Sequence, residues 1–151
     1  AVLHGWHRIG PRRPVRGPIA CRGVNILAAL FIDGIELRQV PGPSTRIDLS
    51  GIQFSAEPPA PYPLTWAPHL VVVVHCPEGQ PTTAALEVVF IRDGEQIARS
   101  VQPLEVESGK FNYRLVRAEM EFEGPGTVEA HCRLDDGPAT VIPYTLLPEA
   151  P

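Results

Sequence analysis

The sequence predicts an all-β fold, an antiparallel two-sheet β-sandwich of the immunoglobulin-like or a similar Greek-key type, with about eight strands. Apolar and polar residues alternate within 118–123 and again within 127–135, and this period of two is typical of a strand with one buried face. The 18 prolines and 13 glycines fall mostly between apolar runs, where they mark turns between many short strands. No stretch has the ~3.6-residue period of an amphipathic helix.

The clearest strands lie on either side of Gly124-Pro125-Gly126. Before this turn, glutamates alternate with the apolar residues Ala118, Met120 and Phe122. After it, one parity holds Val128, Ala130, Cys132 and Leu134, and the other holds Thr127, Glu129, His131, Arg133 and Asp135. We therefore predict two neighbouring strands of a meander that organises the fold.

The composition is that of an ordinary globular domain. A chain of 151 residues with 44% hydrophobic and 20% charged residues suits a single domain. The net charge is −4, and the acidic body lacks the clustered lysines and arginines that bind nucleic acid. No apolar run reaches the ~18 residues of a membrane span. Three cysteines are too few for a disulfide scaffold, and without an export signal we expect a cytoplasmic protein.

Residues 1–23 differ from the rest of the chain. They have no apolar period and no acidic residue, and they carry the arginines Arg8, Arg12, Arg13, Arg16 and Arg22. We predict either a flexible, basic N-terminal arm or a non-native extension with the true start near Val24. The single domain is then predicted over 24–151.

The first part of the domain predicts a hairpin. The apolar run Ile26 to Ile32 is followed by Asp33-Gly34, which is a favoured two-residue turn, and then by alternating residues from Ile35. Farther on, the alternation changes phase at Gly51, which indicates a β-bulge.

The run Leu70 to Val74 is the most hydrophobic strand, and it does not alternate. Both of its faces should therefore be covered. One face meets the core, and the other needs a loop, the N-terminal arm or another subunit.

A second hairpin is predicted over 83–101, about Asp93-Gly94. A two-residue turn there places Arg92 opposite Glu95, Phe90 opposite Ile97, and Leu86 opposite Val101.

Two further strands follow. The strand that begins with Phe111, Tyr113 and Leu115 changes parity at Val116, which predicts a bulge or a break. The last strand holds Ile142, Tyr144 and Leu146, and Pro143 indicates that it lies at a sheet edge.

The sequence contains no catalytic signature. The nucleophile elbow, the zinc-protease helix motif, the phosphate-binding glycine loop, the dinucleotide fingerprint and C-x-x-C are all missing. We predict no enzymatic activity and no cofactor.

Two His-Cys dipeptides, His75-Cys76 and His131-Cys132, hold ligands that zinc accepts. Neighbouring residues of a strand point to opposite faces, so the four side chains cannot converge. We predict no metal site, and we favour free thiols over a Cys76–Cys132 disulfide. Acidic residues at predicted turns, Asp33, Asp93 and Asp135-Asp136, suit calcium if they gather, but turn chemistry explains each of them alone.

Four segments carry a resemblance: AALFIDG, PLTWAPHLVVVV, IRDGEQIA and FEGPGTVEAHCRLDDG. Through them, about residues 25–148 resemble a family of small, stand-alone bacterial β-sandwich proteins of uncharacterised function. The resemblance implies the fold and a single domain, and it supplies no active-site residue.

We expect a binding module whose partner is an unknown protein or a second copy of the chain. The candidate partner-binding residues are Tyr62 and Trp66, in and after the proline-rich loop 57–63, and Val72 and Val74 on the apolar strand. One alternative is an enzyme or a ligand- or metal-binding sandwich with a pocket near His75 or His131. Another is a structural subunit of a larger assembly, with residues 1–23 ordered on assembly.

Overall fold

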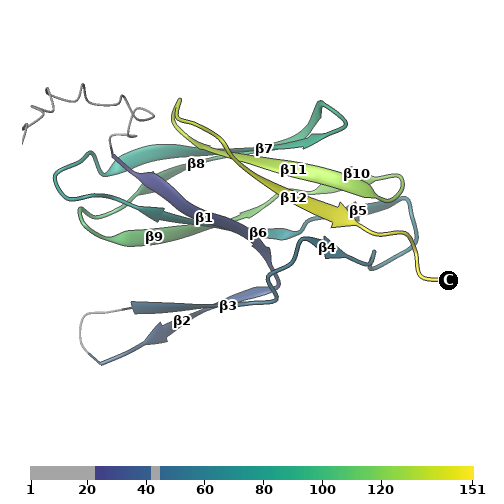
Figure 1. Cartoon of the computed structure of the whole chain (residues 1–151), viewed down its shortest axis with the longest axis horizontal. Helices are drawn as coiled ribbons and strands as arrows, with labels where there is room; N and C mark the ends of the chain where they lie inside the picture. The colour runs from purple at the N-terminus through teal and green to yellow at the C-terminus, as the bar shows by residue number, and fades with distance from the viewer. Residues whose placement is uncertain (1–22, 42–44) are drawn as a thin grey trace, which may run out of the picture.

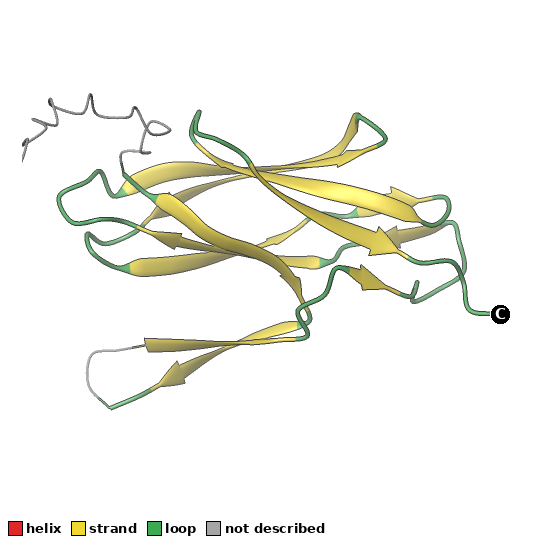
Figure 2. Ribbon diagram, in the orientation of Figure 1, coloured by secondary structure: helices red, strands yellow, loops and turns green. Residues whose placement is uncertain are grey.

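The computed structural model describes residues 23–41 and 45–151, and this part of the chain contains strands and no helix (Figures 1 and 2). The predicted all-β class is confirmed. The described residues form 12 strands in four hydrogen-bonded sheets, where about eight strands in two sheets were predicted. The predicted N-terminal arm lies outside the described residues, apart from Gly23.

The strands are β1 (Asn25–Ile32), β2 (Gly34–Gln39), β3 (Thr45–Ser50), β4 (Ser55–Ala56), β5 (Leu64–Trp66), β6 (His69–His75), β7 (Thr83–Arg92), β8 (Glu95–Glu105), β9 (Phe111–Arg117), β10 (Met120–Phe122), β11 (Gly126–Leu134) and β12 (Thr140–Leu146). Because the described part has no helix, it has none that is long and apolar enough to cross a membrane.

One layer is the five-stranded sheet, in the order β4-β12-β11-β7-β8. Its strands pair antiparallel, except that the short β4 runs parallel to β12. On β11 the predicted alternation is confirmed, because Val128, Ala130 and Cys132 are fully buried. On its other side, β12 pairs with β4 only at Thr145 and Leu146.

The other layer is the three-stranded sheet, in the order β1-β6-β9. The prediction that both faces of its central strand β6 are covered holds in part. Leu70, Val72 and Val74 on the core face have no exposed surface, whereas on the other face Val71 is fully buried and Val73 is half-buried. The β5–β10 pair continues this sheet in the same register. His69 faces Arg117, and three residues farther along each strand Trp66 faces Met120.

The two layers share one hydrophobic core (Figure 1). Phe31 of β1 and Tyr144 of β12 meet across it with ring centroids 4.9 Å apart. The Trp66 indole nitrogen donates to the Tyr144 hydroxyl at 3.2 Å. The inward side chains of both sheets therefore form one packed interior.

The predicted meander is wrong. β10 pairs with β5, whereas β11 pairs with β7 and β12. The turn around Gly124 thus carries the chain from one layer to the other, although each strand alternates as predicted.

The predicted hairpin at Asp33-Gly34 is also wrong. β1 pairs with β6, and β2 pairs with β3 to form a separate two-stranded sheet. The Asp33 amide donates to the carbonyls of Ser50 at 3.0 Å and Gly51 at 3.1 Å. Gly51 ends β3 with a φ of +64°, so the change of phase there marks a turn at the strand's end.

The hairpin of β7 and β8 has its turn as predicted and its register shifted. Arg92 faces Glu95, and Asp93 and Gly94 both have positive φ. A bulge then places Phe90 opposite Ala98 in place of Ile97. The same shift places Leu86 opposite Gln102 in place of Val101, and it brings Arg99 to the Glu87 carboxylate at 2.7 Å.

The predicted break in the strand from Phe111 does not occur. β9 pairs with β6 from Phe111 to Arg117 without a shift. Val116 points into the core and is buried, while Leu115 points to the other face and is 44% exposed. The parity changes because both faces of this strand carry apolar residues.

Candidate functional site

The face of the three-stranded sheet that points away from the core is apolar, and we call it the outer face. The pairing of the three strands aligns its residues in rows. The rows hold His75 and Phe111; Ala28, Val73 and Tyr113; Leu30, Val71 and Leu115; and Ile32, His69 and Arg117.

The outer face is covered at one end and open at the other. Ile32 and Val71 are 2% and 0% exposed, close to the point where β1 ends. Farther from this point Phe111 is 63% exposed, and its ring lies 4.5 Å from that of His75, centroid to centroid. Leu115, at the edge of the sheet, is 44% exposed. Phe111 and Leu115 therefore leave apolar surface in water on β9.

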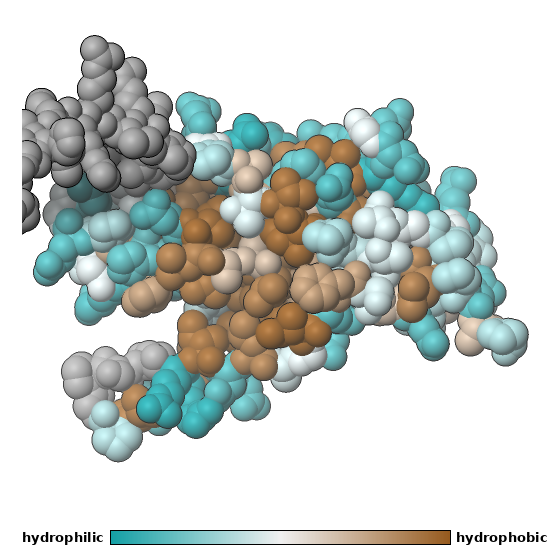
Figure 3. All heavy atoms as spheres, viewed as in Figure 1, coloured by the Kyte–Doolittle hydropathy of each residue, from teal (hydrophilic) through white to brown (hydrophobic). Residues whose placement is uncertain are grey.

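A second apolar surface lies on the β2–β3 hairpin. One face of this hairpin holds Ile35, Leu37, Ile47 and Leu49, as the pairing of Ile35 with Leu49 and of Leu37 with Ile47 shows. Leu37 is 59% exposed. In Figure 3 the hairpin stands off from the body with open space between them, and hydrophobic side chains gather along β1 and around the base of the hairpin.

The opposite face of the hairpin is charged. Arg38 donates to Asp48 with its Nε 2.8 Å from the carboxylate oxygen. This hydrogen bond lowers the pKa of Asp48 from its ordinary value. The hairpin is therefore amphipathic, with a paired charge on one face and aliphatic side chains on the other, of which Leu37 is exposed and the rest are half-buried.

The four candidate partner-binding residues do not come together on a surface. Val72 and Val74 are fully buried in the core, which leaves them no surface for a partner. Trp66 is half-buried against the core. The Tyr62 hydroxyl donates to the carbonyl of Leu147 at 2.7 Å, so this side chain fastens its loop to the C-terminal segment.

The two His-Cys dipeptides do not bring their side chains together as metal ligands. His75 points to the outer face and His131 to the solvent face of the five-stranded sheet, while Cys76 and Cys132 are buried free thiols. Burial raises the pKa of Cys132 to about 12. Over 23–41 and 45–151, no three His, Cys, Asp or Glu side chains gather as metal ligands do.

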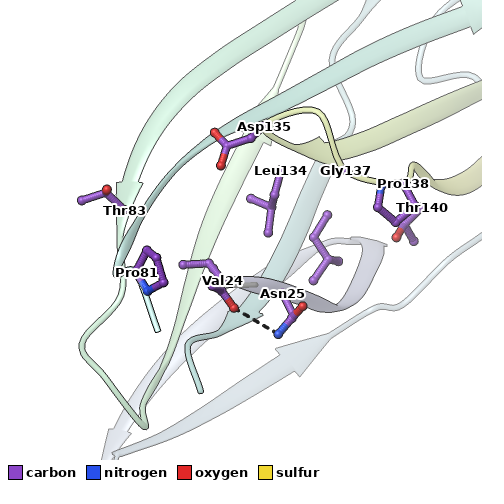
Figure 4. Close-up of a pocket in the computed structure, with 11 residues that line it drawn as sticks. Val24, Asn25, Pro81, Thr83, Leu134, Asp135, Gly137, Pro138 and Thr140 are labelled. Carbon is purple, nitrogen blue, oxygen red and sulfur yellow. Dashed lines mark hydrogen bonds between the residues drawn. The ribbon is translucent and has the colours of Figure 1, made fainter. Parts of the chain in front are cut away.

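A cavity of about 440 Å³ opens at the end of the molecule where β1 begins. Its labelled side chains come from β1, from the segment that leads into β7 and from the β11–β12 turn (Figure 4). Val24, Pro81 and Leu134 provide apolar walls, and Asp135 provides a carboxylate. Neither His75 nor His131 lines it.

Three of the acidic turn residues, Asp33, Asp93 and Asp135, have structural roles in their own turns. Asp135 accepts a hydrogen bond from the Ala85 amide at 3.0 Å, and Asp33 accepts one from the Gln53 side chain at 2.8 Å. Asp93 occupies the first position of its turn. Turn chemistry accounts for all three.

Comparison with known proteins finds no protein-family model that matches this chain and no similar curated protein.

Proposed function

We propose that this all-β chain is a β-sandwich, immunoglobulin-like or of a similar Greek-key type, and that it acts as a non-catalytic interaction module. Two packed layers around one core support the sandwich, and the continuous register of β6–β9 and β5–β10 supports a single inner sheet. The partner is a protein or a second copy of the chain.

The open part of the outer face is the observation that carries this function. Phe111 is 63% exposed and Leu115 44% exposed, and Tyr113 is partly exposed between them. Contiguous apolar patches of more than a few hundred Å² are rare on monomers and mark interaction sites. Aromatic residues such as Phe and Tyr are also enriched in protein interfaces.

A matched pair of variants tests the proposal. Leu115→Asp places a charge on the open part of the outer face, and Val101→Asp places one at a similarly exposed position (51%) on the other layer. The measurements are light scattering of the purified protein and affinity capture from cells that express it natively. We expect Leu115→Asp to weaken association by about tenfold or more, because a buried, unpaired charge costs over ~1.4 kcal/mol.

Val101→Asp is expected to associate as the wild type does. Association that is equal in both variants would contradict a role for the outer face. Circular dichroism of each variant shows whether it keeps the strand content of the wild type.

The cavity favours a second candidate, small-ligand binding. Its volume of about 440 Å³ lies in the range of small-molecule sites, and Asp135 suits a ligand with a cationic group and an apolar body. Thr140→Trp fills the cavity mouth. Thermal-shift screening with small hydrophobic amines should then give a shift in the wild type and none in this variant, and no shift in either would dismiss the candidate.

We further propose membership of the small bacterial β-sandwich family and a cytoplasmic location. The four segments of the resemblance fall on β1, on β5 and β6, on the β7–β8 turn and on β10 and β11, which supports the first. Free thiols at Cys76 and Cys132 suit a reducing compartment and support the second.

A further inference from the structure

We propose that the outer face binds a second copy of this chain, and that the β2–β3 hairpin of each copy packs across the outer face of the other. This inference rests on the proposed function, in which the outer face is a protein-binding surface. It adds the identity of the partner and the element that makes the contact.

The hairpin is incomplete by itself. β2 and β3 pair with each other and with no other strand of the described chain. An isolated two-stranded hairpin is marginally stable in water and needs a surface to cover its apolar face. In this hairpin that face includes Leu37, which is 59% exposed.

The base of the hairpin holds it in a fixed direction. The Asp33 amide donates to the carbonyls at the end of β3, and the Asp33 carboxylate accepts from the Gln53 side chain. The Gln53 amide donates to the carbonyl of Phe31 at 2.9 Å, which ties the same point to the core. Gly51 packs so closely that a Cβ there would lie 2.1 Å from an Asp33 carboxylate oxygen. These contacts fix the direction of the hairpin relative to the core, so its apolar face is held ready for a contact with another molecule.

Each chain carries both halves of the contact. The hairpin has an apolar face on which Leu37 is exposed, and the outer face leaves Phe111 and Leu115 exposed. A two-fold dimer uses the same surfaces on both copies, so that each hairpin meets the partner's outer face. The charged side chains Arg38 and Asp48 lie on the other face of the hairpin, so the contact buries no charge from it.

The size of the contact suits a weak dimer. A strand of six residues is ~20 Å long and a two-stranded hairpin is ~10 Å wide, which gives at most ~200 Å² for one hairpin across one outer face. Each copy takes part in two such contacts, or ~400 Å² of flat area. This is less than the ~800 Å² per partner of an ordinary stable interface and is in the range of weak, transient interfaces.

Cross-linking between separately labelled copies tests the geometry. Leu37→Cys is made in one sample and Leu115→Cys in another, both in a Cys21→Ser background, and the two are mixed and oxidised. We expect a disulfide-linked dimer in the mixture, because Leu37 of one copy lies on the outer face of the other. The control mixes Leu37→Cys with Val101→Cys, since Val101 lies on the opposite layer and is 51% exposed, against 44% for Leu115.

A cross-linked yield no higher than that of the control would overturn the inference. So would a wild-type chain that stays monomeric by light scattering at high concentration. If the chain is monomeric but Leu115→Asp loses a captured protein, the second copy is excluded and the interaction module stands. If Leu115→Asp changes neither measurement, both proposals fail.

Discussion

At the scale of single residues, Gly51 has the most constrained backbone position in the described chain. Its φ is +64°, and a Cβ would meet the Asp33 side chain at 2.1 Å. Gly79 has a similar φ of +74° but open space around it. Gly79→Ala should lose ~1–2 kcal/mol of unfolding free energy for its left-handed backbone alone. Gly51→Ala should lose ~1–3 kcal/mol more because of the collision.

Urea denaturation of the two variants measures this difference. Equal losses would contradict the close packing of Gly51 on Asp33. The comparison isolates the collision, because both variants place an alanine at a positive φ.

Cys132 predicts a dependence of stability on pH. Burial raises the pKa of its thiol from 9.0 to about 12. Between these values the unfolded chain loses the proton and the folded chain keeps it, so the unfolding free energy should fall as the pH rises above about 9. The slope for one such proton is at most ~1.4 kcal/mol per pH unit.

Urea midpoints of the wild type and Cys132→Ala, measured from pH 7.5 to 10.5, separate this effect from other titrations. The tyrosines and the single lysine, Lys110, are present in both proteins, so their contributions cancel in the difference. Parallel curves over this range would show that the Cys132 thiol is not shielded as the structure has it.

At the scale of elements, the proline-rich loop is fastened at Tyr62. Its amide donates to the Glu149 carboxylate at 2.8 Å and its hydroxyl to the Leu147 carbonyl at 2.7 Å. Tyr62→Phe removes the second bond and should cost ~0.5–1.5 kcal/mol in urea denaturation. Tyr113→Phe is the control, since its hydroxyl has no hydrogen-bond partner within the described chain, and it should be nearly neutral. A neutral Tyr62→Phe would mean that the loop is held by other contacts.

The sequence predicts strands well where one face is buried and the other is exposed to solvent. β10 and β11 satisfy this condition, and both alternate as expected. Pairing was harder, because the partner of β1 is β6, about 40 residues away, whereas Asp33-Gly34 is only a local turn signal. The bulge between β7 and β8 moves the predicted register by one residue, and the turn signal at Asp93-Gly94 contains no sign of it.

The candidate site was missed for a related reason. The apolar residues on both faces of β6 favour Val72 and Val74 as surface candidates, but β6 is a central strand and both side chains are buried in the core. The exposed residues lie on the neighbouring edge strand β9. The change of parity between Tyr113 and Val116 was the available signal. Such a change of parity has two interpretations, a bulge or a strand with apolar residues on both faces, and the structure has the second.

At the scale of the whole molecule, the two layers depend on each other. Tyr144 of the five-stranded sheet contacts Phe31 of β1, and its hydroxyl accepts from Trp66 of β5. The short β5–β10 pair has few ladder bonds of its own, but Met120 and Phe122 are buried in the shared core. Packing against the other layer thus stabilises it, and the described domain should unfold as one unit.

Trp66 reports on this cooperativity. The sequence has two tryptophans, so replacing Trp6 by Phe leaves Trp66 as the single indole fluorophore. Its fluorescence follows β5, and far-UV circular dichroism follows all strands. We expect the same urea midpoint from both measurements. Tyr144→Ala removes a fully buried ring, so it should cost ~3–5 kcal/mol of unfolding free energy and lower both midpoints together. A Trp66 transition that precedes the dichroism change would show instead that β5 and β10 detach before the two main sheets separate.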